Sequence, residues 1–466
     1  VASLEIPLAE SRFSPGHVSS DYYYRIPVRP IYESYPVYHP DREPPGYRPW
    51  LMEQEPAIAF DSTRLKTEED WIKAGEVVFD APIDFDPRML VTVESVRDRR
   101  WHRALGMPVA GDGTLPFFRY VIRQKGKVEL GVNSCATCHA RVMPDGSVIK
   151  GAQGNMPYDR AAAFAMRLRS SEASDKQDFL KAVKRERRLA LGVPWLRPDP
   201  LAYIEQMSLE DIASAHEAIP PGVTVRVNSS LRHPPQVPSL IGIKERSYLD
   251  HTGRVRHRSI GDLMRYAAHV QGALRYDRFG DFRITERLPD PSTQLRYSDE
   301  QLYALALYVY SLQPPPNPHK YDALAARGKN VFEREGCGMC HAPPLYTNNK
   351  LTPVEGFEPP AEHLKDLDVF PVCVSTDPGL ALRTRKGTGY YKVPSLKGVW
   401  YRGPFEHSGS VATLEDWFDP RRTRDDFVPT GFRGYGVKTR AVKGHPFGLD
   451  LSEEERKALI AFLRTL

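Results

Sequence analysis

The chain has few cysteines and no long apolar run, and both shortages restrict what it can be. Its 466 residues include only five cysteines, an odd and sparse set that argues against a disulfide framework. No stretch approaches the roughly 20 apolar residues of a spanning helix, so we expect no membrane span. The N-terminus, VASLEIPLAE, lacks the basic start and apolar run of a signal peptide, so we expect any exported protein to be in its processed form.

The net charge is also small for a chain of this length. There are 64 basic and 59 acidic residues, which gives a formal charge of +5 and favours neither a nucleic-acid nor a membrane-surface partner. The hydrophobic content of 41% is enough for the cores of two or three domains. We therefore expect two domains and an extension.

Four of the five cysteines form two C-x-x-C pairs, and each pair is followed directly by histidine. The pairs are Cys135 with Cys138 in CATCH, and Cys337 with Cys340 in CGMCH. In C-x-x-C-H the two thiols bond to a haem and the adjacent imidazole becomes the proximal iron ligand. A thioredoxin-like pair does not need the histidine, and a four-thiolate zinc site has no reason to repeat it. The sequence predicts two covalent c-type haems with proximal ligands His139 and His341.

Three further segments recur in the same order in both halves of the chain. WIKAGEVVFD (71–80) is similar to LAARGKNVFE (324–333), and YSDEQLYALALYVYSL (297–312) to LSEEERKALIAFLRTL (451–466). VPSLIGIKERSYLDHTGRV (237–255) matches VPSLKGVWYRGPFEHSGSV (393–411) without a gap, 156 positions apart. This pattern predicts a duplicated domain, and hence a mainly α protein with two tandem cytochrome c-like haem domains.

Proline-rich segments suggest the boundaries. QPPPNPHK (313–320) cannot continue a helix and is the expected linker, between an N-terminal haem domain over 70–315 and a C-terminal one over 320–466. Helices with capping boxes at Ser298 and Gln301, and at Ser452 and Glu455, are expected to close the two domains. Residues 1–69, rich in Pro and Tyr, are expected to form an irregular extended arm on the body of the protein.

The paired motifs, each with its VPSL…HxG segment, resemble the bacterial di-haem cytochrome c peroxidase and MauG superfamily over about residues 70–466. The run YKVPSLKGVWYRGPFEHSGSVATLEDW (391–417) is the most specific piece and also resembles the di-haem rubber oxygenases. The resemblance implies an exported, periplasmic enzyme in which the haem on His139 meets peroxide or oxygen. The haem on His341 then stores or relays electrons.

The C-terminal haem departs from the family pattern. The peroxidases place a methionine on this iron, but no methionine follows Met339. A different ligand should lower the potential of this haem. In MauG a tyrosinate takes this position, and by resemblance Tyr435 is our first candidate, with His407, His445 and Cys373 as alternatives.

The reactive haem also departs from the pattern. The family uses a glutamate to move a proton between the two oxygens of peroxide, but DLMRYAAHVQGALRYD (262–277) contains no glutamate. Its polar candidates are Tyr266, His269 and Gln271, of which His269 has the pKa best suited to proton transfer near neutral pH.

Two further family features fall on altered residues. His251 stands where an inter-haem tryptophan is usual, so it is a candidate for binding a haem propionate, with Trp400 or Trp101 as the electron-hopping site. The family also holds a calcium ion between its domains. Here Gln236 replaces the asparagine ligand, and Arg402 and Pro404 match the carbonyl positions.

The preferred prediction is a periplasmic di-haem peroxidase that reduces hydrogen peroxide to water through high-valent haem states shared by its two haems, with electrons from a small redox protein. The alternatives are a MauG-like protein-modifying enzyme or a rubber-oxygenase-like dioxygenase and, in a different class, a di-haem electron carrier. The predicted cofactors are two covalent haems and one calcium ion. The oligomeric state stays open.

Overall fold

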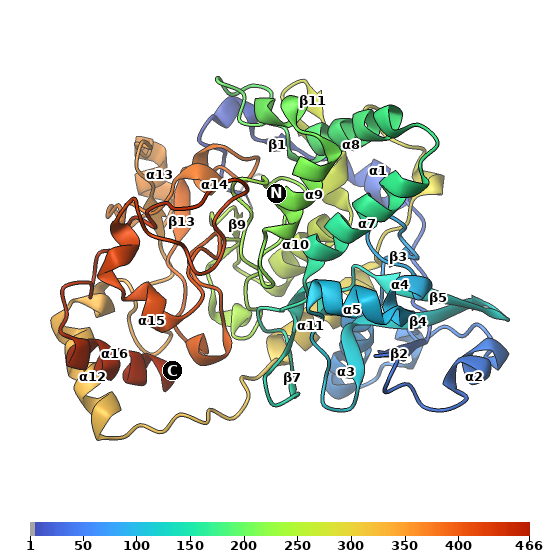
Figure 1. The fold of residues 1–466 in the computed structure, drawn as a ribbon, viewed down its shortest axis with the longest axis horizontal. Helices are drawn as coiled ribbons and strands as arrows, with labels where there is room; N and C mark the ends of the chain where they lie inside the picture. The colour runs from blue at the N-terminus through green and yellow to red at the C-terminus, as the bar shows by residue number, and fades with distance from the viewer. Residues whose placement is uncertain (1–4) are drawn as a thin grey trace.

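The computed structural model describes residues 5–466, in which helices predominate, as expected, and several small antiparallel sheets join them (Figure 1). The helices are α1 (Ser20–Arg25), α2 (Tyr47–Glu53), α3 (Glu68–Asp80), α4 (Val93–Arg97), α5 (Arg99–Leu105), α6 (Cys135–His139), α7 (Tyr158–Glu172), α8 (Lys176–Leu191), α9 (Leu209–Glu217), α10 (Ile260–Val270), α11 (Asp299–Ser311), α12 (Ala323–Arg334), α13 (Ala361–Asp366), α14 (Gly379–Leu382), α15 (Leu414–Trp417) and α16 (Glu453–Arg464). The strands are β1 (Pro15–Gly16), β2 (Ser34–Tyr38), β3 (Asp84–Phe85), β4 (Thr114–Gln124), β5 (Lys127–Val132), β6 (Ala140–Val142), β7 (Val148–Lys150), β8 (Tyr248–Leu249), β9 (Val255–Arg256), β10 (Arg278–Phe279), β11 (Phe282–Arg283), β12 (Leu351–Pro353) and β13 (Tyr390–Lys392).

The same helix pair occurs twice. In the N-terminal half α3 packs on α11, and in the C-terminal half α12 packs on α16. A glycine makes each crossing close: a Cβ on Gly75 would lie 2.0 Å from the carbonyl oxygen of Ala304, and one on Gly328 would lie 1.8 Å from that of Ala458. These residues occupy equivalent places in the repeated segments, so the repeat is present in the packing as well as in the sequence.

The repeated VPSL…HxG segment also repeats its backbone. Gly242 and Gly398, 156 positions apart, both adopt a left-handed conformation and begin a short 3-10 turn. Asp250 and Glu406, again 156 positions apart, have positive φ angles of 67° and 69° although neither is glycine. Side chains rarely tolerate this region, so its recurrence indicates that the surrounding structure imposes one conformation on both copies.

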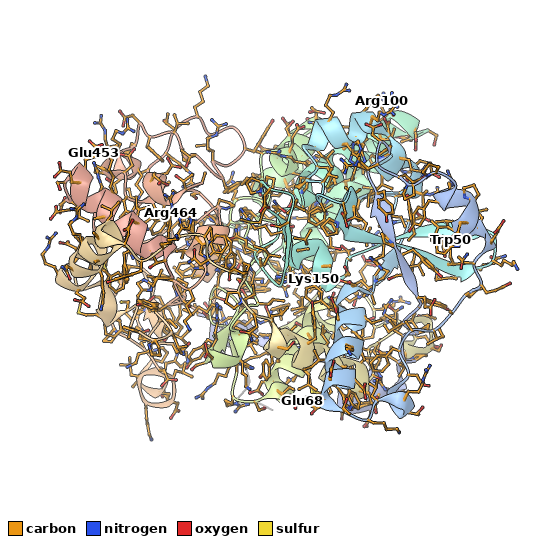
Figure 2. The ribbon with its side chains drawn as sticks, turned by 90° about the horizontal axis from the view of Figure 1, so that it is seen from below. Trp50, Glu68, Arg100, Lys150, Glu453 and Arg464 are labelled. Atoms are coloured by element: carbon orange, nitrogen blue, oxygen red, sulfur yellow. The ribbon has the colours of Figure 1, made fainter. Side chains whose placement is uncertain are left out.

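Helix ends agree with the sequence signals. The predicted capping boxes are present at Ser298 with Gln301 and at Ser452 with Glu455. Helix α11 ends at Ser311, and α12 begins at Ala323 after the proline-rich segment. In Figure 1 that segment is the extended trace leading to α12, and α12–α16 lie together on one side of the molecule. Figure 2 shows Glu453 and Arg464, on α16, at the opposite end from Trp50.

A four-stranded sheet was not predicted. Its order is β2-β4-β5-β3, with all neighbours antiparallel. The sheet positions the first haem motif, because β5 ends at Val132 and α6 begins at Cys135. Of the described residues, none belongs to a helix long and apolar enough to cross a bilayer.

The N-terminal arm, expected over 1–69, is more ordered than predicted. Residues 1–4 lie outside the described residues, and the remainder contains α1, α2, β1 and β2. Strand β2 adds to the sheet through β4, and β1 pairs with β10. Backbone pairing with distant segments therefore gives the arm a regular structure that its local composition does not predict.

The close helix crossing gives the first prediction. Gly75→Ala should lower the free energy of unfolding by about 1–3 kcal/mol, because its methyl group overlaps the backbone of Ala304. Gly261→Ala is the control, since its new methyl group would meet nothing closer than 3.6 Å. Unfolding followed by circular dichroism measures both, and an equal effect of the two substitutions would contradict the close crossing.

Candidate haem-binding sites

The first C-x-x-C-H motif forms a short helix at the wall of a cavity. The side chain of Ser134 caps α6 by accepting a hydrogen bond from the Thr137 backbone N–H, and Thr137 Oγ1 donates to the carbonyl of Phe117 on β4 (2.9 Å). Cys135, Cys138 and His139 line a cavity of about 440 Å³, which we call the N-terminal cavity.

The second motif lies at a separate cavity of about 280 Å³, the C-terminal cavity. Cys337, Cys340 and His341 line it, and His341 Nδ1 donates a hydrogen bond to the carbonyl of Pro394 (3.1 Å). That bond leaves Nε2 free to bind a metal, which is how the orientation of a ligating histidine is commonly fixed.

The cysteines fit covalent haem better than zinc. All five are free, and the two C-x-x-C pairs line different cavities, so they cannot form one four-thiolate site. Each pair is instead followed by a histidine that lines the same cavity, as covalent haem requires.

Positive charge at the C-terminal cavity also fits haem. Arg246, Lys392 and Arg402 line the cavity, and none forms an ion pair with a carboxylate within residues 5–466. Burial and the neighbouring Arg246 lower the pKa of Lys392 to about 7. Buried cations need an anionic partner. The two propionates of a haem supply such a partner.

A second imidazole faces His341 across the C-terminal cavity. The ring centroids of His341 and His445 are 6.3 Å apart. Two imidazole nitrogens on opposite sides of one metal, each about 2 Å from it, place the ring centroids roughly 6 Å apart. Burial, with the charges of His341 and Arg422, lowers the pKa of His445 to about 3, so its ring is neutral, as a metal ligand must be.

The other candidates for that position are exposed or already have close partners. Tyr435, the first choice from the sequence, is 45% exposed, and its hydroxyl donates to Asp211 (2.6 Å), away from the residues that line the cavity. Cys373 is exposed as well. His407 lines the cavity, but its ring stacks on Tyr391 at 4.3 Å and bonds to Glu406. The geometry thus favours His445 over Tyr435, because His445 lies at the cavity opposite His341 and the Tyr435 hydroxyl bonds elsewhere.

The three distal candidates from the sequence meet at the N-terminal cavity. Tyr266, His269 and Gln271, at the end of α10, all line it, and Gln271 Nε2 lies 3.1 Å from Cys135 Sγ. No second histidine within residues 5–466 makes a ring contact with His139 like that of His445 with His341. The two cavities therefore differ in the group opposite the proximal histidine.

One pair at this cavity was missed by the sequence reasoning. His216 Nδ1 donates to Asp159 (2.7 Å), and both residues are buried and line the N-terminal cavity. His216 Nε2 is buried and has no hydrogen-bond partner in the described chain. Asp159 and His216 lie on α7 and α9, far apart in sequence, and only helix packing reveals the pair.

The candidates for inter-haem contact do not lie together. His251 lines the C-terminal cavity, where its Nε2–H donates to the carbonyl of Gln236 (2.6 Å). Trp101 is fully buried against Phe118, and Trp400 packs beside His319. Neither tryptophan lines either cavity.

The proposed calcium ligands do not fit a cation. The carbonyl of Pro404 accepts hydrogen bonds from the side-chain amides of Gln236 and Gln153, the latter at 3.1 Å. Gln153 Oε1 in turn accepts from the Gly403 N–H (3.1 Å) and from Gln236 (3.0 Å). Calcium requires a cage of oxygens. Here amide N–H groups point at the Pro404 carbonyl, one of the two carbonyls expected to bind the ion, so the contact between these residues needs no ion.

Comparison with known proteins supports the family resemblance. No family model matches the chain. Cytochrome-c peroxidase IdrP1 of Denitromonas iodatirespirans is 30% identical over 170 residues, which are 31% of this chain and 40% of that protein. The chain is thus similar to one cytochrome c peroxidase over part of its length, which supports the resemblance to the di-haem peroxidase and MauG superfamily. Since the match spans 40% of the relative, the activity and partners of that whole protein do not transfer directly.

Two solved structures are also similar to this chain. Hydrazine synthase of Kuenenia stuttgartiensis has a TM-score of 0.32 and 15% identity, covering 65% of this chain and 92% of that one. A MauG-like protein associated with microbial copper homeostasis has a TM-score of 0.30 and 18% identity, covering 53% and 78%.

The hydrogen bonds of Gln153 with Gly403, Pro404 and Gln236 give the second prediction. Gln153→Leu should lower the free energy of unfolding by about 1–3 kcal/mol, because it leaves the buried Gly403 N–H without its partner. Gln313→Leu is the control, since this exposed side chain bonds only to a neighbouring carbonyl. Removing calcium with a chelator should leave the thermal midpoint of unfolding unchanged. A lower midpoint that recovers when calcium is added would show that the protein does bind calcium.

Proposed function

We propose that this protein is a periplasmic di-haem peroxidase that reduces hydrogen peroxide to water, with electrons from a small one-electron redox protein. The observation that carries the proposal is the difference between the two cavities. His445 faces His341 across one, whereas His139 has no such partner among residues 5–466 at the other. An open position next to iron is what a substrate needs, and a closed one suits electron transfer.

Each half of the chain would hold one haem, through Cys135 and Cys138 in the region 70–315 and through Cys337 and Cys340 in 320–466. The bound haems supply the redox chemistry of iron. The reaction takes one hydrogen peroxide, two electrons and two protons and yields two waters. The donor protein delivers the electrons one at a time.

His269 is the proposed proton carrier at the N-terminal cavity. Burial lowers its pKa, so the ring is neutral near pH 7 and can accept a proton. Its Nε2 makes no hydrogen bond within the described chain, while its Nδ1 faces Glu5. His269 Nε2 would take a proton from one oxygen of peroxide and pass it to the other, so that the O–O bond breaks with water as the leaving group. The two donor electrons and two further protons would reduce the remaining oxygen to the second water. Tyr266 and Gln271 would hold the substrate by hydrogen bonds.

At the C-terminal cavity, His341 and His445 would hold the second haem between them. Two imidazoles give iron a lower potential than imidazole with methionine, so this haem would favour its oxidised state. Arg246, Lys392 and Arg402 would bind its propionates. His251, which lines the same cavity, would take part in this hydrogen bonding.

The test is peroxide turnover by the holoprotein. With a reduced one-electron donor, it should consume peroxide and oxidise two donor molecules per peroxide. Oxygen uptake in the presence of polyisoprenoid, or crosslinking of a protein substrate, without peroxide turnover would favour the oxygenase or MauG-like alternative. If the protein does not react with peroxide at all, the remaining alternative is a di-haem electron carrier.

The third prediction concerns haem attachment. The intact polypeptide should carry the mass of two covalent haems, and Cys135→Ala or Cys340→Ala should weaken attachment at its own site only, because one thioether bond is lost. Cys373→Ala is the control and should keep both haems. Mass spectrometry of the denatured chain measures this, and an unmodified mass for the native protein would rule out c-type haem.

The fourth prediction concerns His445. His445→Ala should convert the haem at His341 from six-coordinate to five-coordinate or water-ligated, with a raised potential, since one imidazole donor is lost. Tyr435→Phe should change neither haem, because its hydroxyl bonds to Asp211. Optical spectra and redox titration report both variants. The assignment fails if Tyr435→Phe abolishes the six-coordinate spectrum and His445→Ala leaves it intact.

A further inference from the structure

Two residues of the N-terminal arm contact His269, which lines the N-terminal cavity, in a cluster of five charged or titratable side chains. His17 Nε2 lies 2.5 Å from a carboxylate oxygen of Glu5, and His17 Nδ1 lies 2.6 Å from Asp277 Oδ1. Arg254 lies 3.6 Å from both carboxylates. His269 packs its ring on His17, with centroids 4.2 Å apart, and its Nδ1 is 3.5 Å from Glu5 Oε1. We call these five residues the arm cluster.

Backbone pairing places the arm cluster. Ile6, next to Glu5, donates its N–H to the carbonyl of Arg254 (2.7 Å). Strand β1, which ends at the residue before His17, pairs with β10, which begins at the residue after Asp277. Each charged residue of the arm is thus held beside its partner by a hydrogen-bonded backbone neighbour, so the cluster is a built feature and not a chance surface contact.

The charges within the cluster balance. Burial alone would lower the pKa of His17, but hydrogen bonds to Asp277 and Glu5 raise it to about 9, so His17 is an imidazolium. Burial opposes ionisation of Glu5, yet bonds with His17 and His269 and the charge of Arg254 hold its pKa well below the usual range. Two carboxylates therefore face two cations, and His269 remains neutral.

We propose that the arm is a working part of the N-terminal cavity: Glu5 and His17 are positioning residues that hold His269 neutral, protonated on Nδ1, with Nε2 ready to accept a proton. The Glu5 carboxylate faces Nδ1 and favours a proton there. The His17 imidazolium, whose ring is tilted by 43° against that of His269, opposes a second proton. The proposal rests on the peroxidase function and assigns the arm a role in it.

A metal ion is the alternative for this cluster. Ligand atoms of Glu5, His17 and His269 all lie within 4.8 Å of one another. However, both nitrogens of His17 already bond to carboxylates, and Arg254 adds a positive charge beside the same oxygens. A divalent cation would have to displace these partners, so the observed arrangement favours proton positioning.

Cyanide binding tests the role without turnover. Hydrogen cyanide must lose its proton to bind ferric haem, so its association rate should depend on pH through His269, whose surroundings are Glu5, His17, Arg254 and Asp277. Glu5→Gln removes a negative charge, so the inflection of this rate should move to lower pH. His17→Gln removes a positive charge, so the inflection should move to higher pH. A merely structural role predicts no such opposite shifts.

The control is another arm histidine in similar surroundings. His39 lies 3.7 Å from Asp41 and packs on His102 at 4.4 Å, yet neither ring lines the N-terminal cavity. His39→Gln should therefore leave the inflection unchanged. Asp277→Asn repeats the charge change of Glu5→Gln and should shift the inflection in the same direction, so the test survives if one variant does not fold. Thermal midpoints identify the folded variants.

The outcomes separate the two proposals. If the native protein binds no cyanide, the cavity has no open iron position and the peroxidase proposal fails with the arm's role. If the native protein binds cyanide but Glu5→Gln and His17→Gln leave the inflection in place, or shift it in the same direction, only the role of the arm is overturned.

Discussion

Both haem motifs depend on one close helix crossing, made twice. Where Gly75 meets Ala304, and again where Gly328 meets Ala458, a helix lies against its partner with no room for a side chain. Helix α6, with the first motif, contacts α3 of one pair, and the turn with the second motif contacts α12 of the other. The crossing therefore fixes the position of each C-x-x-C-H segment. In the C-terminal copy the VPSL segment also supplies a carbonyl, that of Pro394, which orients His341.

The function depends on how the two copies differ on that common frame. In the C-terminal copy a loop brings His445 opposite His341. In the N-terminal copy the corresponding space is lined by α10, α7 and α9, and the arm contacts one lining residue, His269, through Glu5 and His17. The same C-x-x-C-H motif thus has different surroundings in the two copies, and this difference is the basis for the proposal that one cavity binds substrate and the other serves electron transfer.

Local chemistry made part of this structure predictable. A C-x-x-C-H motif can be recognised from five consecutive residues, and a capping box such as Ser298 with Gln301 from one helical turn. Both can therefore be predicted from the sequence alone. The repeated segments also predicted the repeated helix pair. The sheet is different: β4, TLPFFRYVIRQ, is rich in aromatic and β-branched residues and has partly alternating burial, a signal that was present in the sequence but not used.

Side chains that meet over long sequence distances were not predictable. His445 lies 104 positions after His341 and has no flanking motif, so the sequence placed Tyr435 ahead of it. His216 with Asp159, and Glu5 with His17 and His269, meet only because backbone pairing and helix packing join distant segments. The hydrogen bonds from the amides of Gln153 and Gln236 to Pro404 depend on which way each side chain points, and a sequence does not contain that information.

The central claim is that one iron is open and the other is held between two imidazoles. An electron paramagnetic resonance spectrum of the fully oxidised holoprotein tests it most directly. The account predicts one high-spin ferric haem and one low-spin ferric haem with bis-imidazole g values, in equal amounts. Two low-spin haems, or a low-spin haem whose g values require a tyrosinate ligand, would contradict it.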